Sequence, residues 1–173
     1  MTGWSGLGVN ATLSNNFIKE KSMKLKLLVF VLIMSLFSFG LHAQKIPSKL
    51  EGVTEVSTTQ VKKWLDGGKD VFLLDTRNKS EFAAGHLPDA GNCPISGHQK
   101  YTKKEINQAE KALKRCRAIS SLSKNSVIVT YCNSRTCLSS VKASLALVKM
   151  GYGNIHWMRD GISVWERKNF PVE

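Results

Sequence analysis

Acidic residues are scarce in this sequence. Its 173 residues include 13 Asp and Glu against 25 Lys and Arg, and the formal net charge at pH 7 is +12. A balance this basic is compatible with nucleic acid, an anionic surface or a small anionic substrate as the partner. The basic residues are scattered among few aromatics and form no recognisable nucleic-acid-binding motif, so no nucleic-acid partner is expected.

Cysteine is also infrequent, with four residues: Cys93, Cys116, Cys132 and Cys137. No two of them are spaced as CxxC and no HxxxH pair lies nearby, so the spacing does not resemble a zinc site, and no metal or cofactor is expected. Four cysteines allow three full pairings, and the sequence does not choose among them. Cys93 and Cys116 are candidates for a stabilising disulfide in an oxidising compartment.

No apolar run is long enough to make a good membrane span. The run from Leu27 to Met34 follows two lysines and resumes, with small residues between, over residues 36–41. A short positive segment, a short apolar core and a small residue at the end predict a secretory signal peptide over residues 23–43, cleaved after Ala43. An uncleaved membrane anchor is the alternative.

Met23 is the predicted start of the protein, and residues 1–22 are then an upstream extension that is not native. Four basic residues and one acidic residue lie within residues 1–43, so the remainder keeps a net charge of +9. This remainder is long enough to bury a core of its own. We expect an exported monomer without membrane attachment after cleavage, periplasmic in a bacterium with two membranes and otherwise secreted.

Strand and helix patterns alternate along the rest of the chain, after a loose lead-in over residues 44–54. Short apolar runs predict strands over residues 71–74, 126–131 and 154–158, and an edge-like strand over residues 90–95. Helices are predicted after the cap Ser57 and over residues 79–84, 102–119, 138–150 and 161–168. The alternation indicates an α/β fold with a mostly parallel sheet.

In a parallel sheet the working site lies past the carboxyl ends of the strands. Two segments meet this condition here, Asp75–Arg77 and the loop after Tyr131.

The loop from Cys132 to Leu138 runs from a predicted buried strand into a predicted helix. Its backbone N–H groups can turn inward, as at anion-binding helix N-termini. These donors and the helix dipole would lower the pKa of the Cys132 thiol below its usual value of roughly 8.5, and Arg135 adds positive charge. We predict a thiolate nucleophile that faces an anion site. The alternatives are a buried packing cysteine and a Cys132–Cys137 disulfide.

Three motifs, in order along the chain, resemble those of the rhodanese family. The first is Leu73–Arg77 with Glu81-Phe82 and Gly85–Ala90, the second is Val129–Cys132 with its loop, and the third is Gly151-Tyr152, Asp160-Gly161, Trp165 and Pro171-Val172. The resemblance covers roughly residues 50–173. It implies a rhodanese α/β domain there, a small parallel sheet flanked by helices.

The resemblance also implies a sulfurtransferase. Cys132 would take sulfane sulfur from a donor such as thiosulfate, become a persulfide and pass the sulfur to a thiophilic acceptor such as cyanide or a protein thiol. The N–H groups of the loop would stabilise the persulfide, and Arg135 would bind or steer the anionic donor. The implied substrate-binding residues are Asn133, Ser134, Arg135, Thr136, Cys137 and Leu138.

Loop length separates the activities within this family. Loops one residue longer that end in arginine suit phosphate. Here the fifth and sixth residues after Cys132 are Cys137 and Leu138. A phosphatase or arsenate-reductase activity is therefore disfavoured.

Cys137 leaves two interpretations open. Its thiolate could attack a persulfide on Cys132, release sulfide and leave a disulfide, or its side chain could fill the first turn of the helix. A thiol–disulfide redox protein that uses Cys132 and Cys137 is accordingly a second functional hypothesis, and a non-catalytic binding module is a third.

The remaining residues of the motifs are predicted to be structural. Asp75 caps a turn, and Arg77 can form an ion pair with Glu81. His86 is predicted to be a hydrogen-bonded turn residue, since sulfur transfer from an ionised thiolate needs no base. Trp165 is predicted to lie in the core.

Overall fold

The computed structural model describes residues 20–21, 23–26, 46–97 and 100–173. The chain falls into two units, Met1–His42 and Ala43–Glu173. Apart from residues 23–26, which are helical, the predicted signal peptide and its cleavage point lie outside the described residues and stay a prediction. No helix in the described part of the chain is long and apolar enough to cross a membrane.

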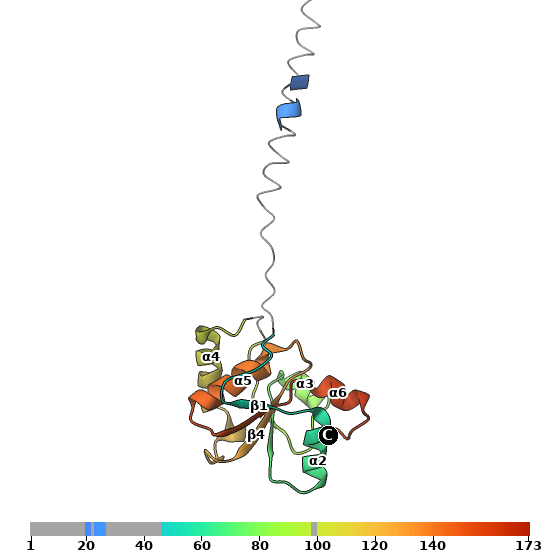
Figure 1. Cartoon of the computed structure of the whole chain (residues 1–173), viewed down its shortest axis with the longest axis vertical. Helices are drawn as coiled ribbons and strands as arrows, with labels where there is room; N and C mark the ends of the chain where they lie inside the picture. The colour runs from blue at the N-terminus through green and yellow to red at the C-terminus, as the bar shows by residue number, and fades with distance from the viewer. Residues whose placement is uncertain (1–19, 22, 27–45, 98–99) are drawn as a thin grey trace, which may run out of the picture. The chain divides into compact units, whose positions relative to one another are not determined.

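A sheet of five strands forms the centre of the second unit, in the order β1-β5-β4-β2-β3 (Figure 1). Every pairing is parallel, as the alternation of strands and helices predicts. In the central strand β4 every residue after Val127 is buried, which explains why it has an unbroken apolar start. The bounds are β1 Val53–Glu55, β2 Phe72–Asp75, β3 Gly91–Asn92, β4 Val127–Tyr131 and β5 Asn154–Trp157.

Helices cover both faces of this sheet. Figure 1 shows α4 and α5 on one side, and α2, α3 and α6 on the other. Consecutive strand residues point to opposite faces. Leu74 packs with residues of α4 and α5, whereas Leu73 packs with Val61 of α2 and the fully buried Trp165 of α6. The bounds are α2 Thr58–Asp66, α3 Lys79–Ala83, α4 Lys103–Lys114, α5 Leu138–Lys149 and α6 Ile162–Arg167.

The predicted lead-in over residues 44–54 is wrong at its end, because β1 begins at Val53. This strand pairs with β5 at one edge of the sheet, with Val53 opposite Ile155. Two of its three residues are exposed. A strand this short has neither an apolar run nor an alternation from which sequence could identify it.

The predicted helix over residues 102–119 is interrupted. α4 ends at Lys114, and a separate 3-10 turn spans Arg117–Ile119. Cys116, between them, is extended (φ −85°, ψ 119°) and forms a disulfide with Cys93, which follows β3. The disulfide thus joins the segment after α4 to the residue that follows the edge strand β3. The predicted strand over residues 90–95 is an edge strand as expected, but only Gly91–Asn92 pairs regularly.

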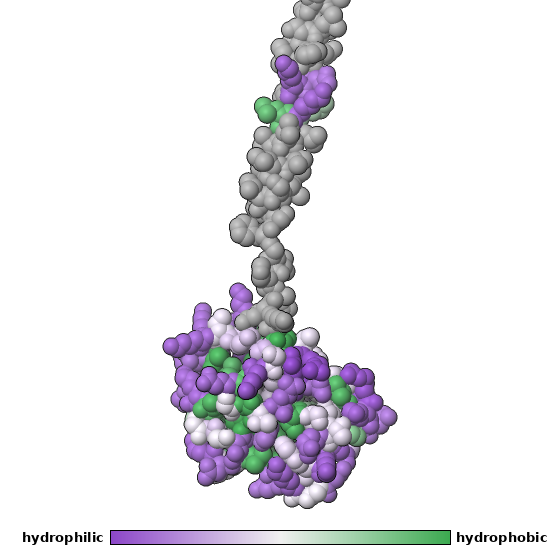
Figure 2. Space-filling view, in the orientation of Figure 1, coloured by the Kyte–Doolittle hydropathy of each residue, from purple (hydrophilic) through white to green (hydrophobic). Residues whose placement is uncertain are grey.

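The lysines of α4 face solvent. Lys103, Lys104, Lys111 and Lys114 are all exposed, and Lys114 pairs with Glu110 of the same helix at 2.6 Å. In Figure 2 hydrophilic residues cover most of the visible face of this unit, with smaller apolar patches among them.

Candidate active site around Cys132

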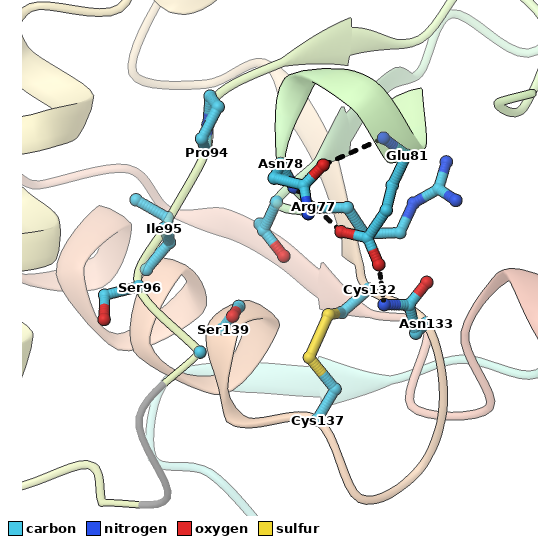
Figure 3. Close-up of a pocket in the computed structure, with 12 residues that line it drawn as sticks. Arg77, Asn78, Glu81, Pro94, Ile95, Ser96, Cys132, Asn133, Cys137 and Ser139 are labelled. Carbon is cyan, nitrogen blue, oxygen red and sulfur yellow. Dashed lines mark hydrogen bonds between the residues drawn. A yellow bond between two sulfur atoms is a disulfide. The ribbon is translucent and has the colours of Figure 1, made fainter. Parts of the chain in front are cut away.

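A pocket of about 330 Å³ lies beyond the carboxyl ends of β2, β3 and β4, at the position expected for a parallel sheet. Cys132 is the first residue after β4, and it is only 2% exposed. Figure 3 shows the walls around it. They consist of Thr76, Arg77, Asn78, Glu81, Pro94, Ile95, Ser96, Gly97, Asn133, Cys137 and Ser139.

The loop after Cys132 is held in place by the start of α6. The carbonyl of Cys132 accepts a hydrogen bond from the N–H of Ile162 at 2.9 Å, and that of Asn133 accepts one from Ser163 at 3.0 Å. Gly161, just before α6, has φ 69° and packs so closely that a β-carbon would lie 2.6 Å from the Cys132 carbonyl oxygen. The third sequence motif therefore positions the loop of the second.

The loop offers backbone donors to an anion. Among the described residues, the amides of residues 133–136 donate to no backbone carbonyl, whereas the N–H of Cys137 donates to Ser134 at 3.1 Å. α5 begins directly afterwards, with Cys137 as its N-cap. The positive end of this helix and the four amides can together stabilise negative charge next to Cys132.

The side chains of the predicted binding residues have different positions. Asn133 and Cys137 line the pocket, but the other four do not. Asn133 donates from Nδ2 to Glu81 Oε1 at 2.7 Å, which ties the loop to α3. The hydroxyls of Ser134 and Thr136 lie 3.0 Å apart and share a hydrogen bond. Leu138 is buried in an apolar cluster, so these side chains shape the loop that supplies the amides.

Arg135 lies outside the pocket wall. Its guanidinium Nη1 is 3.2 Å from Asp160 Oδ1, and its side chain is 60% exposed. A second carboxylate, that of Glu55, lies 4.0 Å from Nη2. The positive charge of Arg135 can attract an anion through solvent, but its guanidinium is not part of the wall around Cys132.

The two loop cysteines are bonded to each other. Cys132 and Cys137 form a disulfide with their α-carbons 6.2 Å apart (Figure 3). With the Cys93–Cys116 bond, this is one of the three pairings that the sequence leaves open. Cys137 is half-buried whereas Cys132 is buried. In this oxidised form Cys132 has no thiolate, so reduction must precede any nucleophilic step.

A buried ion pair supports the pocket from the end of β2. Arg77 Nη2 lies 2.6 Å from Asp75 Oδ2 and also donates to the carbonyl of Gly85 at 2.7 Å. The N–H of Arg77 donates to Asp75 Oδ1 at 2.8 Å, which is the predicted turn cap. Burial acts to lower the pKa of Arg77, but the hydrogen bond and charge of Asp75 outweigh it and the pKa is raised.

The predicted ion pair between Arg77 and Glu81 is wrong. The guanidinium of Arg77 binds Asp75 instead, because a buried carboxylate needs a buried partner. Glu81 closes a capping box on α3, where its Oε2 accepts from the N–H of Asn78 at 3.1 Å, and its other oxygen binds Asn133.

His86 is a turn residue, as predicted. Its Nδ1 lies 3.0 Å from the carbonyl oxygen of Phe82, and its ring stacks on that of Phe82 with centroids 3.7 Å apart. Its backbone N–H and C=O both pair with Glu173 at 2.9 Å. His86 is not among the pocket-lining residues.

Sequence reasoning missed the contact of Glu81 with the loop and the wall over residues 94–97. Glu81 is part of the first sequence motif, and this membership could have indicated that it lies near Cys132. The signal for residues 94–97 is their position after a parallel strand, because the carboxyl ends of such strands meet at one edge. Among the described residues, no group of three His, Cys, Asp or Glu could hold a metal ion.

Known proteins resemble this chain in sequence. The model of the rhodanese-like domain matches residues 57–168. A sulfurtransferase from Allochromatium vinosum is 29% identical over 120 residues, which cover 69% of this chain and 94% of the relative. The probable adenylyltransferase/sulfurtransferase MoeZ of Mycobacterium tuberculosis is 26% identical over 132 residues, 76% of this chain but only 29% of MoeZ.

Solved structures share the fold. The BH2092 protein from Bacillus halodurans superposes with a TM-score of 0.52 at 25% identity, over 69% of this chain and 76% of that protein. Thiosulfate sulfurtransferase from Pseudomonas aeruginosa superposes with a TM-score of 0.51 at 16% identity, over 70% of this chain and 20% of that protein. The family model covers well over half of the chain, and all three motifs lie in the domain built around Cys132. The chain therefore belongs to the rhodanese-like domain family.

Proposed function

We propose that this protein is a sulfurtransferase that carries sulfane sulfur as a persulfide on Cys132, with thiosulfate or a similar small anion as the donor. The observation that carries the proposal is the placement of Cys132 in the pocket, directly before four amides without a backbone acceptor and the N-terminus of α5. A thiolate there is a nucleophile next to an anion site. Relatives named as sulfurtransferases support the reaction class.

The reaction has two displacements. The Cys132 thiolate attacks the sulfane sulfur of thiosulfate, the sulfur–sulfur bond of the donor breaks, and sulfite leaves with the bonding electrons. The persulfide anion is then stabilised by the loop amides. Cyanide or a protein thiolate attacks the terminal sulfur, and Cys132 leaves as a thiolate. Because both nucleophiles are already ionised, no general base is needed, which agrees with the structural role of His86.

Charge and compartment complete the proposal. Arg135 steers the anionic donor toward the loop, and its exposure suits this role better than direct contact does. The protein is exported by residues 23–43 and acts as a monomer. In an oxidising compartment the Cys132–Cys137 disulfide forms, so a reductant must supply the working thiolate.

The test is intact-mass spectrometry of the reduced protein after thiosulfate treatment. We expect the reduced Cys137→Ser variant to gain one sulfur atom, which cyanide removes and which the Cys132→Ser variant does not show. If the Cys137→Ser variant is fully reduced and folded but gains no sulfur, the sulfurtransferase proposal is wrong. If Cys137→Ser abolishes the activity, the thiol–disulfide hypothesis replaces it.

A further inference from the structure

We propose that Cys137 resolves the persulfide on Cys132 within the loop, so that donor sulfur is released as sulfide and an external dithiol restores the enzyme. This activity rests on the proposed persulfide of Cys132. It goes beyond transfer to a sulfur acceptor, because the sulfur is reduced and leaves as a small product.

The structure contains the product of this step. Cys132 and Cys137 both line the pocket and are bonded to each other. The bond is present together with the contacts that hold the loop, since the carbonyl of Cys132 still binds Ile162 at 2.9 Å and α5 still begins at Leu138. The fold therefore accommodates the bond between the two sulfur atoms together with the contacts that hold the loop.

Cys137 is placed as an attacking group. It is the N-cap of a twelve-residue helix, where the helix dipole favours a thiolate over a thiol. The α-carbons of the two cysteines are 6.2 Å apart, within the usual range for a disulfide. Its sulfur can thus reach the inner sulfur of a persulfide on Cys132, while the outer sulfur binds the loop amides.

The step balances as a thiol–persulfide exchange. The Cys137 thiolate attacks Sγ of Cys132, a bond forms between the two Sγ atoms, and the bond from Cys132 Sγ to the terminal sulfur breaks. The terminal sulfur takes one proton from water and leaves as HS⁻ with the bonding electrons. The sulfane sulfur gains two electrons, and the two cysteine sulfurs lose two as they become a disulfide. The amides that stabilise the persulfide anion also stabilise the departing HS⁻.

Burial sets the direction of the return step. Cys132 is 2% exposed, whereas Cys137 is half-buried. An incoming dithiol therefore attacks the sulfur of Cys137 and expels Cys132 as a thiolate into the pocket, where the loop amides stabilise it. The second thiol of the reductant then displaces Cys137 and carries away the disulfide. Each cycle converts one dithiol and one sulfane sulfur into one disulfide and one sulfide.

A single turnover without reductant tests the proposal. Reduced protein is freed of reductant anaerobically and mixed with one equivalent of thiosulfate, after which sulfide and intact mass are measured. We expect about one equivalent of sulfide from the native chain, with two hydrogens lost and no sulfur gained. The Cys137→Ser variant should release less than about a tenth of this sulfide and keep one added sulfur. Cys137→Ala serves as the second variant if Cys137→Ser misfolds.

The Cys93→Ala/Cys116→Ala variant provides the matched control. Cys132 and Cys137 are then the two remaining cysteines of the four in the chain, so a loss of two hydrogens can only be their disulfide. Circular dichroism first establishes that this variant is folded at the temperature used. It should release sulfide as the native chain does.

The outcomes separate this inference from the proposed function. A persulfide that persists in the native chain, with no sulfide released, overturns the inference and leaves the sulfurtransferase intact. Absence of any persulfide in the folded Cys137 variants overturns the sulfurtransferase, and the inference with it. The accessibility of the two sulfurs, which sets where the reductant attacks, is tested separately with glutathione disulfide. The Cys132→Ser variant keeps Cys137 and should form a mixed disulfide faster than the Cys137→Ser variant, which keeps Cys132. The reverse order would contradict the proposed attack on Cys137.

Discussion

Gly161 lies in direct contact with the backbone of Cys132. A β-carbon at position 161 would be 2.6 Å from the Cys132 carbonyl oxygen and equally close to the amide nitrogen of Ser134. The backbone of Gly161, at φ 69° and ψ −176°, is in a region that essentially only glycine adopts. The loop around Cys132 therefore has its shape because the residue before α6 has no side chain at the point of contact.

Replacement of this glycine should be costly. We expect Gly161→Ala to lower the free energy of unfolding by about 3 kcal/mol, from backbone strain and from overpacking against the loop. Gly68→Ala is the matched control, because Gly68 also has positive φ (65°) but nothing within 4 Å of its β-carbon position. It should cost only about 1 kcal/mol. Urea denaturation of both variants gives the comparison, and equal losses would show that the contact with Cys132 has no energetic weight.

Much of this arrangement can be predicted from sequence. The apolar start of β4 and the polar loop after it place Cys132 at the end of a buried strand, and parallel topology then determines which edge carries the site. The helix dipole at Cys137 follows from the same pattern.

Other features depend on distances that sequence does not contain. Arg77 could pair with Glu81 by spacing, yet burial of Asp75 decides the partner. The cysteine pairing likewise follows from tertiary contacts, since the segment after α4 packs against β3 and brings Cys116 to Cys93. β1 escapes prediction because its exposed residues leave no periodic signal.

The Asp75–Arg77 pair makes a second prediction. Asp75 is fully buried and Arg77 is 7% exposed, so Asp75→Ala leaves a buried guanidinium without its counter-charge. We expect a loss of about 3 to 5 kcal/mol in the free energy of unfolding. Asp160→Ala, which removes the nearer of the two carboxylates beside the exposed Arg135, should cost less than about 1 kcal/mol. Chemical denaturation at pH 7 measures both, and a similar loss for the two would contradict the burial argument.

The proposed steering role of Arg135 makes a third prediction. Arg135→Gln should lower kcat/KM for thiosulfate by about three- to tenfold at low salt, because it removes an exposed charge near the anion site. The difference should shrink above about 0.5 M salt, where charges are screened. Lys111→Gln, a charge-matched change on the exposed face of α4, should have little effect. A loss in Arg135→Gln that persists at high salt would indicate direct contact with the donor instead.

Glu110 makes a prediction about pH. Side-chain hydrogen bonds from Lys114 and Lys149 lower the pKa of this carboxyl from its usual 4.5 to about 2. A carboxyl with a lowered pKa contributes stability that is fully present above the usual value and is lost as pH falls toward the folded value. Glu110→Gln should therefore reduce stability at pH 7 but not at pH 2, with the difference disappearing between about pH 4.5 and 2. Thermal melts across this range test it, and a constant difference would contradict it.

The two disulfides should differ in their effect on stability. The Cys93–Cys116 bond closes a separation of 23 residues, and the Cys132–Cys137 bond one of 5. Loop-closure entropy predicts that the Cys93–Cys116 bond stabilises the fold by about 3.5 kcal/mol and the Cys132–Cys137 bond by about 2 kcal/mol. The first also fixes Cys93, directly before the pocket wall at Pro94, whereas the second lies in a loop that α6 already holds by two backbone hydrogen bonds.

The variants Cys93→Ala/Cys116→Ala and Cys132→Ala/Cys137→Ala allow this comparison by denaturation without reductant. The first should lose more stability. Addition of reductant should then destabilise each variant only by the contribution of the bond it retains. If the loop pair proved the stronger stabiliser, that disulfide would be a structural bond rather than one that opens and closes in a catalytic cycle. A weak contribution from Cys132–Cys137 is what the cycle requires, because a bond that is reduced in every turnover must not hold the domain together.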